Sequence, residues 1–304
     1  MYDLWRCGFI RKPLSHVLGP NGVDPASVVW LPESRRSFHY LADPFAIDRD
    51  GVLTVFGEAF DYRSRRGEIH YVQYDAANTV IARGVALAEP FHLSYPSLIE
   101  EGGELYMLPE AHKSGALTLY RCTRFPDRWE PAQELLSVPA IDATVTQFDG
   151  RWWMFYSLPG PHDRAMRELH VAWSDTLMGP WTQHEANPVR SGLSDCRPGG
   201  TAFVHEGALY LPVQDCEEAY GRRLRLLRID TLTPNAFEAI EARRFEPDGV
   251  LNGYLDGLHT LSGDARVTCI DVKRLTSSWA EGPIRTLYKL RRLFRMNGPR
   301  PRAA

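Results

Sequence analysis

The sequence lacks the features that mark membrane-spanning, secreted and metal-stapled proteins. No apolar run approaches the ~18 residues that a membrane-spanning helix needs. The N-terminal segment carries Asp3 and Arg6 and has no apolar stretch of signal-peptide length. The five cysteines are odd in number and show no Cys-x-x-Cys spacing, so we expect reduced thiols rather than a disulfide framework or a zinc site. Together these absences predict a cytoplasmic protein.

The chain also lacks a strong charge of either sign. Its net charge is −3 and its isoelectric point is near 6.4, and no segment interleaves basic and aromatic residues. Nucleic acid is therefore not an expected partner. What the chain has in quantity suits a turn-rich β protein: 24 Gly and 22 Pro are spread along 304 residues, and 44% of the residues are hydrophobic.

A cassette of two strands joined by a turn recurs along the chain roughly every 50 residues. Its first copy opens at residues 39–45, turns at 48–51 and ends its second strand at Glu58. In the first three copies, about 15 residues separate the opening polar group from the closing one. The openings of the five copies contain, in order, Asp43, Tyr95, Asp142, Arg197 and His259. Such a period predicts β units that close into a propeller, with their first strands around one axis.

We therefore expect an all-β fold, a five-bladed β-propeller over residues 1–276. Residues 277–304 differ, because Leu287, Leu290 and Leu293 recur at helical spacing with Arg and Lys between them. This pattern predicts a basic, amphipathic C-terminal helix followed by a tail. The helix either lies on an anionic membrane surface, which would make the protein peripheral, or docks on the propeller with its Arg face in solvent.

Several cassette motifs resemble one known family. They are Ala-Asp-Pro-Phe at 42–45, Leu-Ser-Tyr-Pro at 93–96, Ile-Asp-Ala-Thr at 141–144 and Arg-Pro-Gly-Gly at 197–200. They are similar to the N-terminal domain of plant glucosamine inositolphosphorylceramide transferases, which bacteria carry alone or beside sugar formyltransferases. That domain in turn is similar to the five-bladed propellers of glycoside hydrolase family 43. The resemblance implies a carbohydrate site at the axis and a partner glycosyltransferase or formyltransferase.

Roles for individual residues follow from the resemblance. Asp43 matches the blade-one base and Asp142 the blade-three residue that orients the sugar. His259 matches an axial histidine that often supports a central metal ion, which would be calcium here. A lone histidine is also often a hydrogen-bonded core residue or a proton shuttle. In blade four, Arg197 stands where the family has a glutamic acid, so simple glycoside hydrolysis does not follow.

The residues themselves suggest acid–base chemistry at the centre. Glycoside cleavage needs one carboxyl group that donates a proton and one that attacks or activates water. Asp43, Glu58, Glu110 and Asp142 are the candidate catalytic carboxylates, and crowding would raise the pKa of at least one of them. We expect Asp43 as base or nucleophile and either Glu110 or Glu58 as acid. Each of these carboxylates could instead cap a turn or form a salt bridge.

The candidate ligand contacts surround these acids. They are Arg197, Tyr95, Gln214, Asp215, Tyr220, His259 and His92. Arg197 either neutralises buried carboxylates or clamps a phosphate or carboxylate of a sugar ligand. The tyrosines either stack on sugar rings or serve as packing.

Two functions remain open at this point, and the first is favoured. The first is a carbohydrate-active enzyme of glycan or glycolipid biosynthesis, acting as a hydrolase or transferase at a glycosidic or activated-sugar bond in a central pocket. The second is a non-catalytic sugar-binding module that presents an acceptor to a partner transferase. A propeller that only mediates protein interaction is less favoured, because it would not need clustered carboxylates at its mouth.

Overall fold

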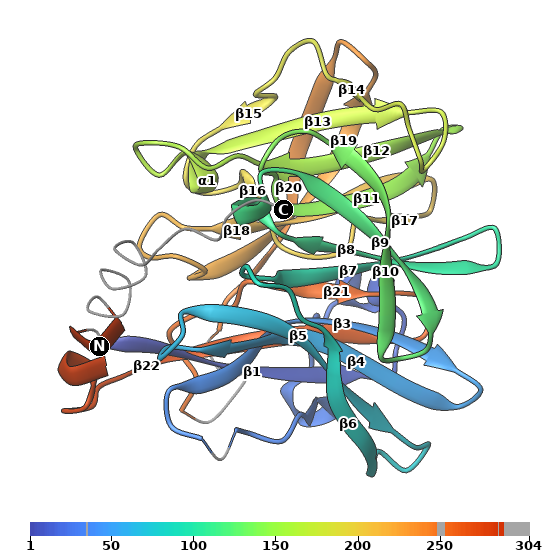
Figure 1. Cartoon of the computed structure of the whole chain (residues 1–304). Coiled ribbons are helices and arrows are strands. Elements are labelled where there is room, and N and C mark those ends of the chain that lie inside the picture. The colour runs from blue at the N-terminus through green and yellow to red at the C-terminus, as the bar shows by residue number, and fades with distance from the viewer. Residues whose placement is uncertain (35, 248–252, 285, 289–304) are drawn as a thin grey trace, which may run out of the picture.

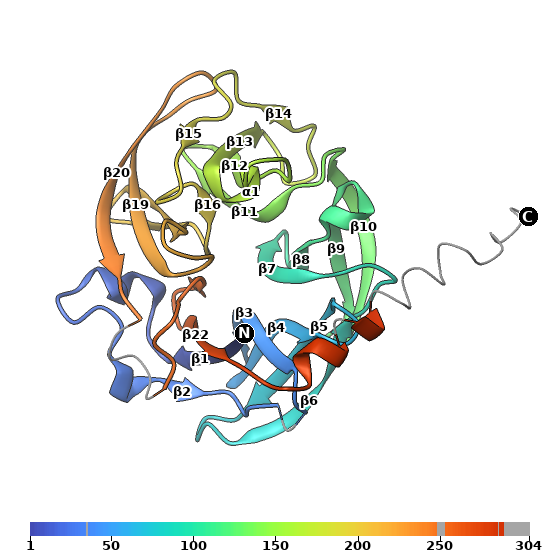
Figure 2. The same ribbon diagram turned by 90° about the vertical axis from the view of Figure 1, so that its left-hand side faces the viewer.

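The computed structural model describes the whole chain except residues 35, 248–252, 285 and 289–304. Its strands form five antiparallel sheets that stand around a central axis (Figures 1 and 2). The predicted all-β, five-bladed propeller is thereby confirmed. Each sheet is called a blade here, and blades are numbered by the cassette that opens them.

Blades one to three each follow the chain in order. Blade one contains β3 (His39–Arg49), β4 (Val52–Asp61), β5 (Arg66–Tyr74) and β6 (Val80–Leu87). Blade two contains β7 (Ser94–Glu101), β8 (Glu104–Glu110), β9 (Leu117–Arg124) and β10 (Arg128–Leu136). Blade three contains β11 (Ile141–Phe148), β12 (Arg151–Ser157), β13 (Glu168–Ser174), β14 (Thr182–Gln183) and β15 (Arg190–Ser191).

Blades four and five are less regular. Blade four contains β16 (Arg197–Pro198), β17 (Phe203–His205), β18 (Ala208–Asp215), β19 (Arg223–Leu232) and β20 (Phe237–Phe245). Blade five contains β21 (Leu261–Gly263), β22 (Thr268–Thr276), β1 (Tyr2–Ile10) and β2 (Val29–Trp30). The short helices are η1 (Leu14–Leu18), η2 (Pro25–Ser27), η3 (His112–Ser114) and α1 (Arg164–Arg167).

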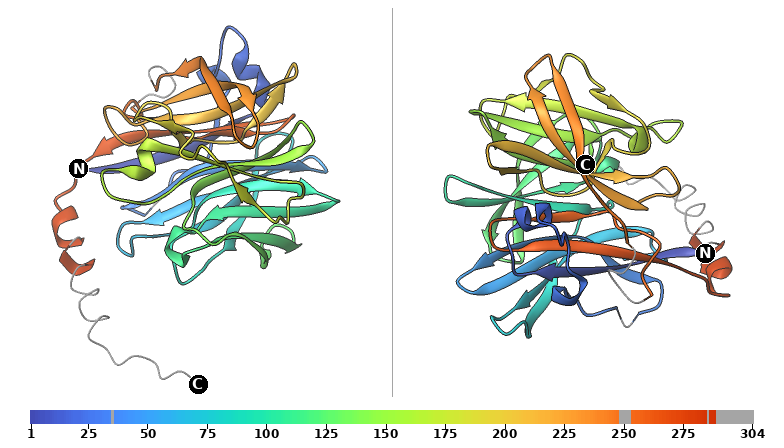
Figure 3. Two further views of the ribbon diagram at one scale, coloured as in Figure 1. Left: turned by 90° about the horizontal axis from the view of Figure 1, so that it is seen from above. Right: turned by 180° about the vertical axis from the view of Figure 1, so that it is seen from behind.

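The ring is closed by the N-terminal strand. β1 pairs with β22 along its whole length, from Tyr2 opposite Thr276 to Ile10 opposite Thr268. Figure 3 shows the two strands side by side although they come from opposite ends of the chain. The sequence pattern of β1 does not indicate its partner. Blade five therefore needs both ends of the described chain.

Tight turns join the inner strand of a blade to the second strand in blades one to four. Both turn residues have positive φ, in the pairs Asp50 and Gly51, Gly102 and Gly103, Asp149 and Gly150, and Glu206 and Gly207. Two-residue turns of this kind match the right-handed twist of antiparallel strands. Gly, Asp and Asn tolerate positive φ best, which explains why the acidic Gly motif recurs in each cassette.

The hydrophobic core lies between the blades rather than on the axis. Five clusters of buried side chains fill the five interfaces between neighbouring blades. Trp152 packs between blades two and three, whereas Trp153 packs between blades three and four. Adjacent strand residues face opposite sides of a sheet, so every blade contributes to two clusters. The axis is left to polar side chains.

The C-terminal segment is only partly covered by the description. Of the predicted basic helix, residues 281–284 and 286–288 are helical, and Trp279 just before them is 92% exposed. Leu290, Leu293 and most of the basic positions lie outside the described residues. Among the helices that are described, none is long and apolar enough to span a bilayer.

Candidate functional site at the axial mouth

The inner strands of blades one to three begin with the same backbone feature. Asp43, Tyr95 and Asp142 have φ of 50°, 46° and 49°, and each lies at a break in the register between inner and second strand. Bulges of this kind re-aim side chains and are common next to functional sites. The end of the axis where these strands begin is called the axial mouth. The sequence period aligned these three residues correctly.

A second set of side chains reaches the axial mouth from the ends of the second strands. Strand register pairs Ala42 with Glu58, Ser94 with Glu110, Ile141 with Ser157, Arg197 with Gln214, and Gly257 with Lys273. All five second-strand residues are buried, and we call them the polar ring. The register also corrects the sequence alignment: Arg197 lies one position ahead of the place that Asp43 and Asp142 occupy in their blades.

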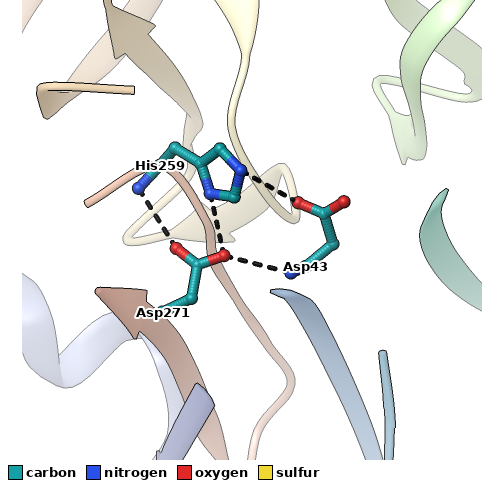
Figure 4. Close-up of side chains that lie close together, drawn as sticks. All are labelled: Asp43, His259 and Asp271. Carbon is teal, nitrogen blue, oxygen red and sulfur yellow. Dashed lines mark hydrogen bonds and ion pairs between the residues drawn. The ribbon is translucent and has the colours of Figure 1, made fainter. Parts of the chain in front are cut away.

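Asp43 is held by a network that joins blades one, two and five. Its Oδ1 accepts a hydrogen bond from Thr260 Oγ1 at 3.0 Å, and its Oδ2 accepts one from the backbone N–H of Tyr95 at 3.2 Å. His259 Nε2 lies 3.5 Å from Asp43 Oδ1, and His259 Nδ1 lies 2.8 Å from Asp271 Oδ2 (Figure 4). Burial raises the pKa of Asp43, and His259 opposes this rise.

His259 is placed between two carboxylates and stacks on Trp5. The two ring centroids are 3.7 Å apart and the planes are tilted by 15°. Burial lowers the pKa of His259, but Asp271 and Asp43 outweigh burial and raise it. An imidazolium whose two N–H groups point at Asp271 and Asp43 fits this geometry.

Asp43, His259 and Asp271 are also the candidate ligands for a metal ion. Asp43, His259 and Asp271 offer ligand atoms within 4.8 Å of one another. However, Asp271 already accepts hydrogen bonds from the backbone N–H groups of Asp43, His259 and Thr260. Calcium takes about six to eight oxygen ligands, and a protonated histidine cannot serve as a ligand. The donor set does not fit the calcium ion that the family resemblance allows at this place, and it forms a closed Asp–His–Asp network instead.

Asp142 forms a buried ion pair with Arg197. Arg197 Nε donates to Asp142 Oδ2 at 2.7 Å, and Gln214 Nε2 donates to the same oxygen at 3.0 Å. Arg197 Nη2 lies 4.0 Å from Glu110 Oε2, so the guanidinium serves two acids. Burial raises the pKa of Asp142, and Arg197 opposes this rise. Arg197 thus neutralises two of the expected catalytic carboxylates.

The pKa values of the two glutamates of the polar ring are shifted in opposite directions. Burial opposes ionisation of Glu110, but its hydrogen bond to His112 and the charge of Arg197 lower its pKa to about 2. Burial and the neighbouring acids Asp43 and Glu110 raise the pKa of Glu58 well above its usual value. Glu58 is therefore the acid of the pair and Glu110 the ionised carboxylate.

His92 belongs to the Glu58 side of the mouth. Its Nδ1 accepts a hydrogen bond from the backbone N–H of Gly67 at 2.8 Å, so the proton of the neutral ring is on Nε2. Nε2 lies 3.6 Å from Glu58 Oε1. Burial lowers the pKa of His92 to about 4, which keeps the ring neutral near pH 7.

Two of the predicted ligand contacts are engaged within the protein. The hydroxyl of Tyr95 accepts from the Gly200 N–H at 2.6 Å and donates to the Gly200 carbonyl at 2.8 Å, which ties blade two to blade four. Asp215 is fully buried and accepts two hydrogen bonds from Arg225, at 3.1 and 2.7 Å. Its partner belongs to β19, so Asp215 is not part of the group around Asp142.

Tyr220 covers the blade-four and blade-five side of the mouth. The residue is 36% exposed. The guanidinium carbon of Arg197 lies 5.1 Å from the ring centroid, and the ring meets that of His259 edge-on at 5.4 Å. Tyr220 is thus a partly exposed aromatic side chain beside Arg197 and His259.

Sequence reasoning missed several members of the site. They are Trp5, His112, Thr260, Asp271 and Lys273. Lys273 could have been found, because its separation from Gly257 equals that of Glu58 from Ala42. Trp5 carried no such signal, since its place beside His259 depends on ring closure by β1.

Fold and site together define a class: a five-bladed β-propeller with a buried, carboxylate-rich polar centre, an architecture shared with glycoside hydrolases. The family model described as Glucosamine inositolphosphorylceramide transferase 1, N-terminal, matches residues 28–280. The chain belongs to this family.

Curated relatives are longer than this chain. Glucosamine inositolphosphorylceramide transferase 1 of Oryza sativa subsp. indica is 37% identical over 206 residues, which is 66% of this chain and 28% of the relative. The protein of the same name from Arabidopsis thaliana is 32% identical over 252 residues, 79% of this chain and 33% of the relative. The chain therefore spans about a third of the length of these relatives.

Solved structures share the fold at low sequence identity. A glycosyl hydrolase from Bacteroides ovatus has a TM-score of 0.58 at 13% identity, over 88% of this chain and 93% of that one. The α-L-arabinofuranosidase of Podospora anserina in complex with cellotriose has a TM-score of 0.56 at 12% identity, over 80% of this chain and 94% of that one. These likenesses establish the architecture.

Proposed function

We propose that this carbohydrate-active propeller recognises a sugar at its axial mouth and presents it as an acceptor in glycan or glycolipid assembly. The family name supports sugar transfer, and one structural neighbour was solved with cellotriose. A fold alone does not determine function, so the proposal is argued from the site.

The observation that carries the proposal is the ion pair between Arg197 and Asp142. A glycosidase needs a protonated acid and a free carboxylate on opposite sides of the bond. Here Asp142 is bonded to Arg197 and Gln214, and the second expected acid, Glu110, faces Arg197 and His112. Arg197 comes from the blade in which the related hydrolases are expected to carry their acid. The geometry favours recognition over cleavage.

An unsatisfied acceptor supports recognition of a hydroxyl-rich ligand. Gln214 Nε2 donates to Asp142 Oδ2 and to the Pro198 carbonyl, both at 3.0 Å, which orients the amide. Its Oε1 is then buried without a hydrogen-bond partner among the described residues. Buried acceptors in native proteins normally have a partner. A sugar hydroxyl is a donor of suitable size and polarity for this place.

The test measures binding before chemistry. Wild-type protein is screened on a glycan array, and hits are titrated by isothermal calorimetry against Tyr220→Ala and Gln214→Leu. We expect both variants to weaken binding about tenfold or more, since stacking and a buried hydrogen bond are each lost. Tyr71→Ala, on β5 of blade one, is the matched control and should bind as the wild type does. Full affinity in Tyr220→Ala and Gln214→Leu would refute the proposal.

A second candidate is catalysis at a glycosidic or activated-sugar bond, and the divergence of the two glutamates favours it. Glu58 keeps its proton and Glu110 does not, and pairs driven apart in pKa often divide acid and base roles. Of the two acids expected from the sequence, only Glu58 fits a proton donor, with Asp43 as base. Aryl glycosides and nucleotide sugars are the substrates to screen. If this candidate holds, Glu58→Gln and Asp43→Asn each lower the rate about a hundredfold or more.

We further propose a cytoplasmic protein that attaches peripherally to membranes through residues 277–304 and works beside a partner glycosyltransferase or formyltransferase. Trp279 at 92% and Leu287 at 50% exposure support an apolar contact of this segment. Sedimentation with anionic vesicles tests the membrane contact. Trp279→Ala should reduce the bound fraction, whereas Met178→Ala, at an exposed residue elsewhere, should not. Equal binding of both variants would argue against the anchor.

A further inference from the structure

Lys273 is a buried cation without a carboxylate partner among the described residues. The residue is 2% exposed, and its ammonium group donates to the carbonyl oxygen of Tyr220. Its Nζ also lies 5.2 Å from the centroid of the Trp5 ring. Within the described part of the chain, no carboxylate oxygen lies within 4.0 Å of it, although Asp3 and Asp256 act on it from farther away. An ammonium has three N–H donors, so burial leaves Lys273 short of acceptors.

Arg197 has unused donors on the same side of the mouth. Its Nε is bonded to Asp142, but neither of its Nη atoms makes a hydrogen bond within the described residues. Arg197 and Lys273 share Tyr220 as a neighbour: the guanidinium carbon lies 5.1 Å and the ammonium 5.9 Å from its ring centroid. Two positive side chains from blades four and five thus face one partly exposed aromatic residue.

We propose that Lys273 and Arg197 form an anion subsite at the axial mouth that binds the phosphate group of a phosphorylated sugar, with Tyr220 as its outer wall. The inference rests on the proposed function and adds the chemical class of the ligand. A phosphate has several acceptor oxygens and can accept from a guanidinium fork and an ammonium at once. Gln214 Oε1, the orphaned acceptor beside Arg197, remains for a hydroxyl of the attached sugar.

The burial pattern explains why the subsite is built this way. Burial lowers the pKa of Lys273, which is the direction expected of a cation that lacks a counter-ion. The acidic half of the mouth, with Glu58 and Glu110, cannot compensate it because Arg197 and the histidines already face those acids. A bound phosphate would complete the charge balance on the blade-five side.

The experiment compares paired ligands that differ by one phosphate. Glucose 1-phosphate, glucose and inorganic phosphate are titrated by calorimetry into the full chain. We expect glucose 1-phosphate to bind about ten- to a hundredfold tighter than glucose, since charge-assisted hydrogen bonds are added. Lys273→Met should remove most of that advantage while glucose affinity stays within about twofold. Arg197→Gln should also remove most of the advantage. Lys12→Met, at an exposed lysine of blade five's connection, is the matched control and should leave both affinities unchanged.

The outcomes separate this inference from the proposed function. Sugar binding without a phosphate preference, or an undiminished preference in Lys273→Met, would overturn the subsite and leave sugar recognition standing. No binding to any glycan or sugar phosphate would overturn both. Circular dichroism and thermal melts of Lys273→Met show whether the variant is folded, and Lys273→Arg, which keeps the charge, should retain part of the preference.

A further arm distinguishes the source of the phosphate. Vesicles of phosphatidylinositol and of phosphatidylcholine are sedimented with wild type, Lys273→Met and Lys12→Met. If the ligand is a lipid headgroup, phosphatidylinositol vesicles retain the wild type more strongly than Lys273→Met. If it is a free sugar phosphate, the calorimetric preference is kept and vesicle binding is the same for all three proteins. Either result supports the subsite and identifies where its ligand comes from.

Discussion

The two halves of the axial mouth use the same backbone positions for opposite chemistry. In blades one and two the second strands contribute Glu58 and Glu110 to the polar ring, whereas in blades four and five they contribute Gln214 and Lys273. All four are buried. Repetition of a strand pair around an axis therefore supplies equivalent places, and the side chain at each place decides its charge.

The buried charges at the axial mouth are stabilised by pairing between the two halves. Arg197 of blade four bonds Asp142 and approaches Glu110, so it links the two halves of the mouth. Buried charges are tolerated when they are paired and hydrogen-bonded. Two buried groups lack such a pair. Lys273 has no carboxylate partner among the described residues, and Glu58 avoids a buried charge by keeping its proton.

The largest loss of folding stability is expected from replacing Arg197, which links the two halves. Arg197→Met should lower the free energy of unfolding by about 3–5 kcal/mol, because it leaves Asp142 buried without its cation. Urea denaturation monitored by tryptophan fluorescence measures the change. The double variant Arg197→Met with Asp142→Asn should recover part of the loss, since the orphaned charge is gone. A single variant as stable as the wild type would show that the two halves are not coupled.

The next effect concerns Glu110 in the acidic half. The pKa of about 2 lies below the ordinary value of 4.5, so the ionised carboxylate contributes stability above pH 4.5 that is lost as the pH falls toward 2. Glu110→Gln should therefore lower the free energy of unfolding by roughly 3 kcal/mol at pH 7. Denaturation curves between pH 3 and pH 8 should show the difference shrinking on acidification. A difference independent of pH would contradict the assignment.

A smaller loss is expected from the tie between blades two and four. Tyr95→Phe removes the hydroxyl that both accepts from and donates to Gly200. Two buried backbone groups lose their partner, which should cost about 1–3 kcal/mol. Thermal unfolding measures the loss, and Tyr106→Phe, at another buried tyrosine of blade two, is the matched control. Equal stability of Tyr95→Phe and wild type would mean that water replaces the hydroxyl.

Glu58 should respond with the opposite sign to Glu110. Its folded-state pKa is raised, so the wild type loses stability as the pH rises from the unfolded value through the folded one. Glu58→Gln imitates the protonated acid and should be more stable than the wild type at neutral pH, by about 1.4 kcal/mol for each unit of the rise. The gain should vanish near pH 4. Destabilisation at neutral pH would show that Glu58 is ionised and paired.

The smallest change is expected at Lys273. Because it has no carboxylate partner within the described residues, Lys273→Met should alter the free energy of unfolding by less than about 1 kcal/mol or raise it slightly. Chemical denaturation at pH 7 checks this directly. A loss as large as that of Arg197→Met would mean that Lys273 is a structural cation rather than a binding group.

Much of the fold could be predicted from local patterns. Alternating side chains, Gly turns and a constant interval placed the inner strands of blades one to four, and they aligned Asp43, Tyr95 and Asp142 at one backbone feature. The partner of β1 could not be predicted, because pairing between the chain ends depends on closure of the ring. The sequence alignment matched Arg197 with Asp43, but Arg197 pairs with Gln214 and so stands where Ala42 stands in blade one. The alignment of Arg197 was therefore one position off.

The sequence by itself determined that this is a repeated β structure with acids at the start of its inner strands, because period and alternation are properties of neighbours along the chain. Only the tertiary structure decided which charges meet. Arg197 reaches Asp142 from 55 positions away, and Asp43 joins His259 and Asp271 across more than 200 positions. Such encounters depend on how five sheets close around one axis, and they determine which acids keep a proton, which are neutralised and which cation lacks a carboxylate partner among the described residues.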